Sequence, residues 1–231
     1  KLVEIAEKSD LIDSLGAWVL EHACRWGKSW QDRGLPAVSL CVKIFESQVN
    51  RGDLSTSIRE SLELTNLPAH LLNLQIAESC VLAAKERAID LLADTRASGI
   101  RISIDHVGTG YASLNYLRRL PIDSLKIDRG FLEQAAAGTQ DSIILDAIIT
   151  MGHNLGLQVV AEGVETPEQL QFLEDRGCDL FQGSLFGPPL PGEEVPRLLS
   201  RTQEQAPDTP LTCPEARSTA TPASPPTRRR A

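Results

Sequence analysis

The sequence predicts an α/β fold in which parallel strands alternate with helices and curve into a barrel. Short apolar runs alternate with longer segments whose apolar residues recur at helical spacing, a pattern typical of parallel β/α architecture. Each apolar run ends near a polar residue or a glycine. Six strands of this kind favour a barrel over a doubly wound sheet, and the chemistry of such barrels lies at the carboxyl ends of the strands.

The elements can be assigned in chain order. The predicted strands are residues 37–44, 71–79, 100–107, 124–128, 157–163 and 178–183. Between the second and third strands, residues 79–99 place Leu82, Ile89 and Leu92 on one helical face. A second helix is predicted over residues 141–156, where Gly156 closes it as a carboxyl-terminal cap.

Composition limits the class of protein. The chain has 231 residues and a net charge of −8, which argues against non-specific nucleic-acid binding because phosphates attract a basic surface. It contains no apolar run of about 18 residues, so no membrane segment is expected. The five cysteines show no CxxC pairing, which favours reduced thiols and a cytoplasmic location. Residues 1–200 read as one domain, whereas residues 201–231 are rich in Pro, Ser and Thr and are predicted to be a disordered tail.

Polar residues stand at the end of every predicted strand, as expected for the rim of one pocket. They are Lys43, Gln75 with Glu78, Asp105 with His106, Lys126 with Asp128, Glu162 with Glu165, and Gln182. The pair Asp105-His106 is the most informative, because a carboxylate beside an imidazole can bind a metal, move a proton, or do neither.

Three stretches resemble one known family. "DHVGTGYASLNYLRRLPIDSLKIDRGFL", "VVAEGVETPEQLQFLEDRGCDLFQG" and "FGPPLP" look like the EAL domain, which hydrolyses the bacterial second messenger cyclic di-GMP to linear pGpG. The resemblance implies a (β/α)8 TIM-like barrel of the EAL type. The Glu-Ala-Leu signature and the two strands around it would precede Lys1, so this chain is expected to lack the first two strands of that barrel.

The resemblance also implies a site for two Mg²⁺ or Mn²⁺ ions. Such hard cations need oxygen ligands, and the family supplies them mostly from carboxylates. In this sequence Glu78, Asp105 and Glu162 remain as metal ligands, whereas Lys43, Gln75 and His106 replace an Asn, a Glu and an Asp. Lys126 and Glu162 match catalytic positions and are expected to be vestigial.

The replacements all act against metal binding. Gln75 and His106 each remove a negative charge, and Lys43 adds a positive one. Two unit charges about 4 Å apart interact by roughly 4 kcal/mol in a partly buried site, and a divalent ion would feel about twice that repulsion from Lys43. We therefore expect no metal to bind, and we interpret Asp105-His106 as a decayed metal site. Lys43 is predicted to pair with Asp105, Glu78 or Glu162 in place of a cation.

The remaining motif residues are expected to contact the ligand or to orient a loop. The resemblance assigns ligand contacts to Asp128, Gln182 and Pro188, and orientation of the loop after the third predicted strand to Glu165, Gly108 and Gly110. Gly108 and Gly110 are expected to shape a turn that needs positive φ or a close backbone approach. Without metals, Lys126 is expected to pair with Asp105 or Asp128.

Three functions remain open at this point. The first is a catalytically inactive EAL-like domain of cyclic di-GMP signalling, which binds partner proteins or retains weak cyclic di-GMP binding. The second is a residual metal-dependent phosphodiesterase. The third is a degenerate fragment with no independent role. The resemblance also implies a possible homodimer.

Overall fold

A sheet of six parallel strands forms the centre of the fold. The computed structural model describes residues 5–6, 9, 11–51, 54–84, 86–108, 114–133 and 139–205. The strands are β1 (Leu40–Ile44), β2 (Leu72–Ala77), β3 (Arg101–Val107), β4 (Ser124–Ile127), β5 (Gln158–Glu162) and β6 (Leu180–Gln182). Each pairs with the next in chain order. The six predicted strands are therefore confirmed.

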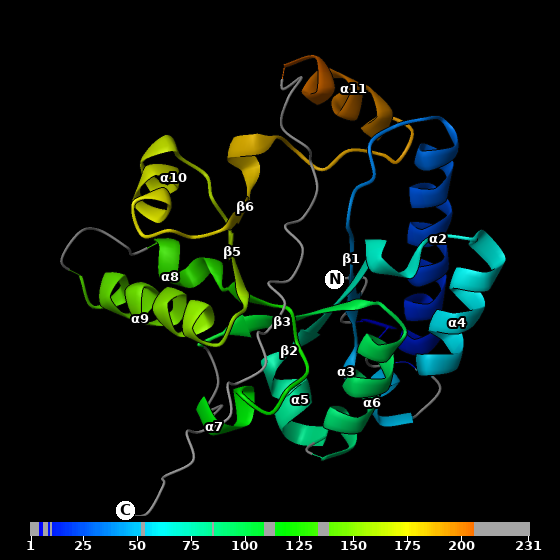
Figure 1. The fold of residues 1–231 in the computed structure, drawn as a ribbon, viewed down its shortest axis with the longest axis horizontal. Helices are drawn as coiled ribbons and strands as arrows, with labels where there is room; N and C mark the ends of the chain where they lie inside the picture. Colours follow the sequence, from blue (N-terminus) through cyan, green and yellow to red (C-terminus); the bar gives the residue numbers. More distant parts are fainter. Residues whose placement is uncertain are drawn as a thin grey trace, which may run out of the picture.

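Helices cover the outer side of this curved sheet, as Figure 1 shows. They are α2 (Ile12–Asp32), α3 (Glu46–Arg51), α4 (Leu54–Thr65), α5 (Glu78–Ala84), α6 (Glu86–Ala97), α7 (Leu114–Leu117), α8 (Arg129–Glu133), α9 (Gln140–Asn154), α10 (Pro167–Glu174) and α11 (Val195–Gln205), with short 3-10 helices at Ala69–Leu71 and Ser184–Phe186. Helix α2 packs on β1, α5 and α6 on β3, and α9 on β4 and β5. The result is a half-barrel in which β1 and β6 are the two edges of the described sheet.

The alternation of side chains explains why the sheet has an apolar and a polar face. Outward-facing residues of the inner strands are almost fully buried under the helices; they include Leu72, Leu74, Ile76, Ile102, Ile104, Leu125 and Ile127. Burial of each such side chain contributes about 1.5–3 kcal/mol to folding. The intervening residues point to the opposite face, because successive side chains of a strand alternate.

The predicted helix over residues 79–99 is helical wherever the structure describes it up to Ala97. It corresponds to α5 and α6, and residue 85 between them lies outside the described residues. Helix α5 begins directly at the end of β2. The predicted helix over residues 141–156 is confirmed as α9, and Gly156 follows it with a φ of 74°.

The segment after β6 returns to the first described helix. The Trp30 indole Nε1 donates a hydrogen bond to the Gly192 carbonyl oxygen at 3.2 Å, and Gly192 packs against Trp26 so closely that a Cβ would lie 2.5 Å from that ring. Because α2 packs on β1, this contact links the region beyond β6 to the opposite edge of the sheet.

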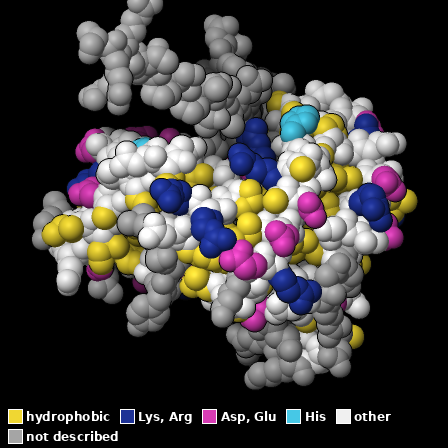
Figure 2. All heavy atoms as spheres, turned by 60° about the horizontal axis from the view of Figure 1, so that its bottom comes forward, with side chains coloured by type: hydrophobic (Ala, Val, Ile, Leu, Met, Phe, Trp, Pro, Cys, Tyr) yellow, Lys and Arg dark blue, Asp and Glu magenta, His cyan; other side chains and the backbone are white. Residues whose placement is uncertain are grey.

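The distribution of charged side chains on the surface agrees with the net negative charge of the chain. Figure 2 shows one face on which Lys and Arg side chains lie among Asp and Glu side chains, without a continuous basic patch. Among the described residues, no helix combines the length and hydropathy needed to cross a bilayer.

Candidate functional site

The polar face of the half-barrel carries the candidate site. In the strand register, Lys43 lies beside Gln75, Gln75 beside Ser103, and Ser103 beside Ser124. One row further along, Ala77 lies beside Asp105, and Glu162 lies beside Gln182. The polar strand ends predicted from the sequence therefore lie along one curved surface, as the carboxyl ends of parallel strands should.

A β-bulge brings Asp105 and His106 to the same face. Ile104 pairs with Leu125 and Val107 with Ile127, so β3 has one more residue than β4 between these pairs. His106 occupies a φ of 58°, a conformation that is uncommon for a residue with a side chain. A bulge of this kind redirects a side chain, and here it turns the imidazole toward Lys43 and Asp128 on the polar face.

Lys43 forms the ion pair predicted from the sequence. Its Nζ lies 3.2 Å from Asp105 Oδ2 and 3.3 Å from His106 Nε2. The Asp105 side chain is 5% exposed, whereas that of Lys43 is 47% exposed. The other Asp105 oxygen, Oδ1, accepts the backbone N–H of His106 at 3.0 Å. Both oxygens of this carboxylate are thus engaged within the protein.

His106 is held from its other side by Asp128. Its Nδ1 lies 2.6 Å from Asp128 Oδ2, while Asp128 Oδ1 accepts the backbone N–H of Gly130 at 2.8 Å. Burial acts to raise the pKa of Asp128, but the hydrogen bonds from Gly130 and His106 outweigh it and lower that pKa below its ordinary value. Asp128 is therefore an ionised carboxylate that orients the imidazole.

Lys126 has different partners from those expected. The sequence suggested Asp105 or Asp128, but Lys126 forms an ion pair with Glu162 and lies 3.5 Å from the side-chain oxygen of Gln182. The correction follows from the register: Lys126 stands beside Val160, two residues before Glu162, and Glu162 stands beside Gln182. Asp105 and Asp128 are instead engaged by Lys43 and His106.

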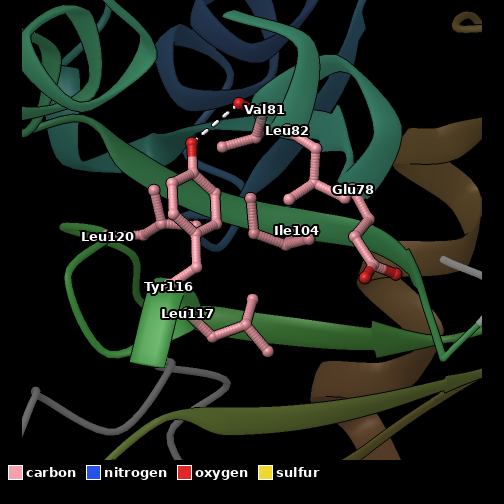
Figure 3. A pocket seen from close by; sticks show the side chains of 7 residues that line it. All are labelled: Glu78, Val81, Leu82, Ile104, Tyr116, Leu117 and Leu120. Atoms are coloured by element: carbon pink, nitrogen blue, oxygen red, sulfur yellow. Dashed lines mark hydrogen bonds between the residues drawn. The ribbon is translucent and has the colours of Figure 1, made fainter. Parts of the chain in front are cut away.

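Glu78 lies at the junction of β2 and α5. It is buried, and its Oε2 accepts the backbone N–H of Gly108 at 3.3 Å. Figure 3 shows its carboxylate directed away from a narrow apolar hollow beside it, which is lined by Val81, Leu82, Ile104, Tyr116, Leu117 and Leu120. That hollow is too narrow to admit a water molecule, so it is a packing defect beside the site and no ligand pocket.

The remaining predicted residues lie around this centre. Gly108 has a φ of 94°, and a Cβ there would lie 3.0 Å from Ile148 and Phe131, which confirms both the positive φ and the close approach. Glu165 is exposed in the loop between β5 and α10, just before the N-cap Thr166, and Pro188 is exposed beyond β6. Gly110 lies outside the described residues.

A polar network that was not predicted from the sequence lies beneath the site. The Ser103 hydroxyl lies 2.8 Å from Asn73 Oδ1 and 2.6 Å from the Ser124 hydroxyl. These residues alternate with buried apolar residues along β2, β3 and β4, so the period-two pattern within each strand was the signal that could have found them.

As arranged, these side chains do not fit a pair of divalent cations. Within the described part of the chain, no group of three or more His, Cys, Asp or Glu residues is placed to hold a metal ion. Lys43 lies between Asp105 and His106, and Lys126 is paired with Glu162. Two ammonium groups therefore already neutralise the carboxylates that a metal would need.

The half-barrel and its polar rim define a β/α-barrel type of domain with a site at the carboxyl ends of its strands. The model of the EAL domain family matches residues 1–189 of this chain. The chain belongs to the EAL domain family.

Similar proteins include phosphodiesterases and ligand-bound EAL domains. NbdA of Pseudomonas aeruginosa, a cyclic di-GMP phosphodiesterase, is 43% identical over 191 residues, which cover 83% of this chain and 24% of NbdA. The structure of the MucR phosphodiesterase in complex with c-di-GMP superposes with a TM-score of 0.81 at 40% identity, over 84% of this chain and 78% of that one. The FimX EAL domain of Xanthomonas citri in complex with c-di-GMP gives a TM-score of 0.75 at 26% identity, over 81% of this chain and 74% of that one.

The match covers only part of the curated relatives. This chain spans 24% of NbdA and 28% of MucR of Pseudomonas aeruginosa.

Proposed function

We propose that this EAL domain acts in cyclic di-GMP signalling by binding cyclic di-GMP or a partner protein without hydrolysing the nucleotide. The observation that carries the proposal is the ion pair between Lys43 and the buried carboxylate of Asp105. The family reaction uses two Mg²⁺ or Mn²⁺ ions, and an ammonium ion at this place repels such cations and competes for the same oxygen.

Binding of cyclic di-GMP can persist after hydrolysis is lost, because the residues that contact the nucleotide differ from those that bind the metals. Metal binding depends on Glu78, Asp105 and Glu162, and each of these accepts a hydrogen bond or an ion pair from within the protein. We assign ligand contacts to Asp128, Gln182 and Pro188, of which Gln182 and Pro188 are exposed at the end of the sheet. We assign Lys126 and Glu162 the role of vestigial catalytic residues. We assign the orientation of the neighbouring loop to Glu165, Gly108 and Gly110.

The two edge strands of the described sheet leave room for further strands of the family barrel. The family barrel has eight strands, and β1 and β6 are the edges of the described sheet. We place two further strands between them, on the side where Gly192 and Trp30 link the ends of the half-barrel. Residues 1–200 then form the EAL domain and residues 201–231 its tail, in a cytoplasmic protein that pairs with signalling partners or with a second copy.

Isothermal titration calorimetry with cyclic di-GMP tests the binding proposal. We expect binding in buffer containing EDTA, with an affinity unchanged on addition of Mg²⁺. Replacement of Gln182 by Ala should weaken binding, whereas the exposed Gln171 of α10, replaced in the same way, serves as a control. Absence of heat at high micromolar nucleotide would leave only the protein-binding version of the proposal.

A residual phosphodiesterase is the second candidate. The observation that favours it is the survival of five family groups at the polar face, namely Glu78, Asp105, Lys126, Asp128 and Glu162. Turnover in Mn²⁺ that is abolished by Glu78→Ala would establish this function.

A further inference from the structure

Gln75 is a buried amide that lacks a hydrogen-bond partner within the described part of the chain. The residue is only 9% exposed, and its side chain forms no hydrogen bond with any residue that the structure describes. Buried polar groups are nearly always hydrogen-bonded to protein, water or a ligand. The Gln75 amide therefore marks a position that a water molecule or a ligand completes.

This amide faces the polar side of the sheet, beside Lys43. Leu74 and Ile76 are almost fully buried under the helices, so the alternation of side chains along β2 directs Gln75 to the opposite face. In the register between β1 and β2, Gln75 stands directly beside Lys43. Neighbouring strands are about 4.8 Å apart, so the two side chains extend side by side from the sheet.

The Lys43 ammonium retains one N–H group for a further partner. An ammonium has three donors and no acceptor. Among the described residues, Lys43 Nζ contacts Asp105 Oδ2 at 3.2 Å and His106 Nε2 at 3.3 Å. The Lys43 side chain is 47% exposed, so a ligand can approach it. The Asp105 carboxylate is already engaged by this ammonium and by the backbone N–H of His106, which reduces its repulsion of an anion.

We propose that Lys43 and Gln75 bind a phosphodiester anion directly, at the place where the EAL family uses metal ions. One N–H of the ammonium and two N–H groups of the amide are available as donors. A phosphodiester offers two charged oxygens that accept such hydrogen bonds. The inference rests on the proposed function, because it names the group of cyclic di-GMP that these two residues hold.

The same reasoning explains both replacements together. Lys43 and Gln75 stand where the family has an Asn and a Glu, which are oxygen ligands for a cation. A carboxylate at position 75 repels an anion unless a cation lies between them, whereas an amide of the same shape donates to that anion. The two replacements thus convert acceptors for a cation into donors for an anion.

A phosphodiester without bases tests this inference separately from nucleotide binding. Dimethyl phosphate is titrated into the full chain in buffer containing EDTA, and binding is followed by broadening of its ³¹P resonance. The unaltered protein should broaden this resonance. Lys43→Met and Gln75→Glu should each weaken binding by about 10-fold or more, because each removes N–H donors and makes the local charge more negative by one unit.

Lys28→Met and Gln171→Glu are the matched controls. Lys28 pairs with Asp32 on α2, and Gln171 donates to Asp175 on α10, so neither belongs to the cluster around Lys43. Both controls should bind dimethyl phosphate as the unaltered protein does. If Lys43→Met does not fold, Lys43→Gln replaces it, because an amide keeps a donor for Asp105 without the charge.

Two results of this titration would overturn the inference. One is no broadening with the unaltered protein, and the other is equal broadening in the unaltered protein, the Lys43 variant and Gln75→Glu. Calorimetry with cyclic di-GMP then separates the two proposals. Nucleotide binding that Gln75→Glu does not weaken would support the proposed function and overturn this inference. Binding of dimethyl phosphate without binding of cyclic di-GMP would support this inference and overturn nucleotide binding.

Discussion

The imidazole Nδ1 of His106 lies 2.6 Å from Asp128 Oδ2, a contact that links the bulge in β3 to the end of β4. The same imidazole faces Lys43 through Nε2 at 3.3 Å. One side chain therefore joins three neighbouring parts of the polar face, and the charges of Lys43, Asp105 and Asp128 are arranged around it. This arrangement is what separates the site from an all-oxygen magnesium centre.

Asp128 should make stability depend on acidity. Its folded-state pKa is lowered below the ordinary value of 3.8, because the hydrogen bonds from Gly130 and His106 outweigh burial. The stability it contributes is complete above the unfolded-state pKa and is lost as the pH falls through the lower folded-state pKa. Asp128→Asn should cost about 1–2 kcal/mol at neutral pH, and the difference from the unaltered protein should shrink toward about pH 3.

Urea unfolding from neutral pH down to about pH 3 measures this difference. Asp94→Asn, at an exposed position on α6, provides the control. A gap between the unaltered protein and Asp128→Asn that stays constant, or grows as the pH falls, would contradict the assigned direction of the pKa.

The pair of Lys126 and Glu162 should contribute to folding as well as to the site. Lys126 is 4% exposed and Glu162 is 23% exposed at their side chains. Lys126→Met removes the cation and leaves a mostly buried carboxylate, which should lower the free energy of unfolding by about 2–3 kcal/mol. Arg129→Ala removes an exposed partner of Glu133 and should cost less than about 1 kcal/mol. Equal effects of the two changes in urea unfolding would show that the Lys126 pair is not structural.

Gly183 should be required for the position of Gln182. A Cβ at Gly183 would lie 2.0 Å from the Val164 carbonyl oxygen, and the Val164 N–H donates to the Gln182 carbonyl oxygen at 3.0 Å. Gly183→Ala should therefore cost about 3 kcal/mol or more, since the obstacle is backbone. Gly177→Ala has open space and only the strain of a φ of 73°, so about 1–2 kcal/mol is expected. Similar melting temperatures for the two variants would contradict this packing.

Restoring the family ligands should restore magnesium binding. The variant Lys43→Asn, Gln75→Glu and His106→Asp replaces an ammonium, an amide and an imidazole with an amide oxygen and two carboxylates, which are the donors that Mg²⁺ prefers. Calorimetry should detect Mg²⁺ binding to this variant and none to the unaltered protein. Equal binding to both would show that the three replacements do not control the metal.

Much of the fold and part of the site could be predicted from the sequence. The strands were recognisable because their apolar residues are continuous or alternate, and the Lys43 pair followed from its charge at a strand end. The partner of Lys126 could not be predicted, because the register that sets Glu162 beside Gln182 depends on long-range strand pairing. The imidazole of His106 points to the polar face because of a one-residue bulge in β3, and no local sequence pattern predicts that bulge.

The most direct test is a hydrolysis assay with cyclic di-GMP in the presence of Mg²⁺ and then of Mn²⁺, with linear pGpG separated by chromatography. We expect cyclic di-GMP to remain intact with either ion, even where calorimetry detects its binding. Steady formation of pGpG that disappears in Glu162→Gln would contradict the proposed binding function and establish a phosphodiesterase.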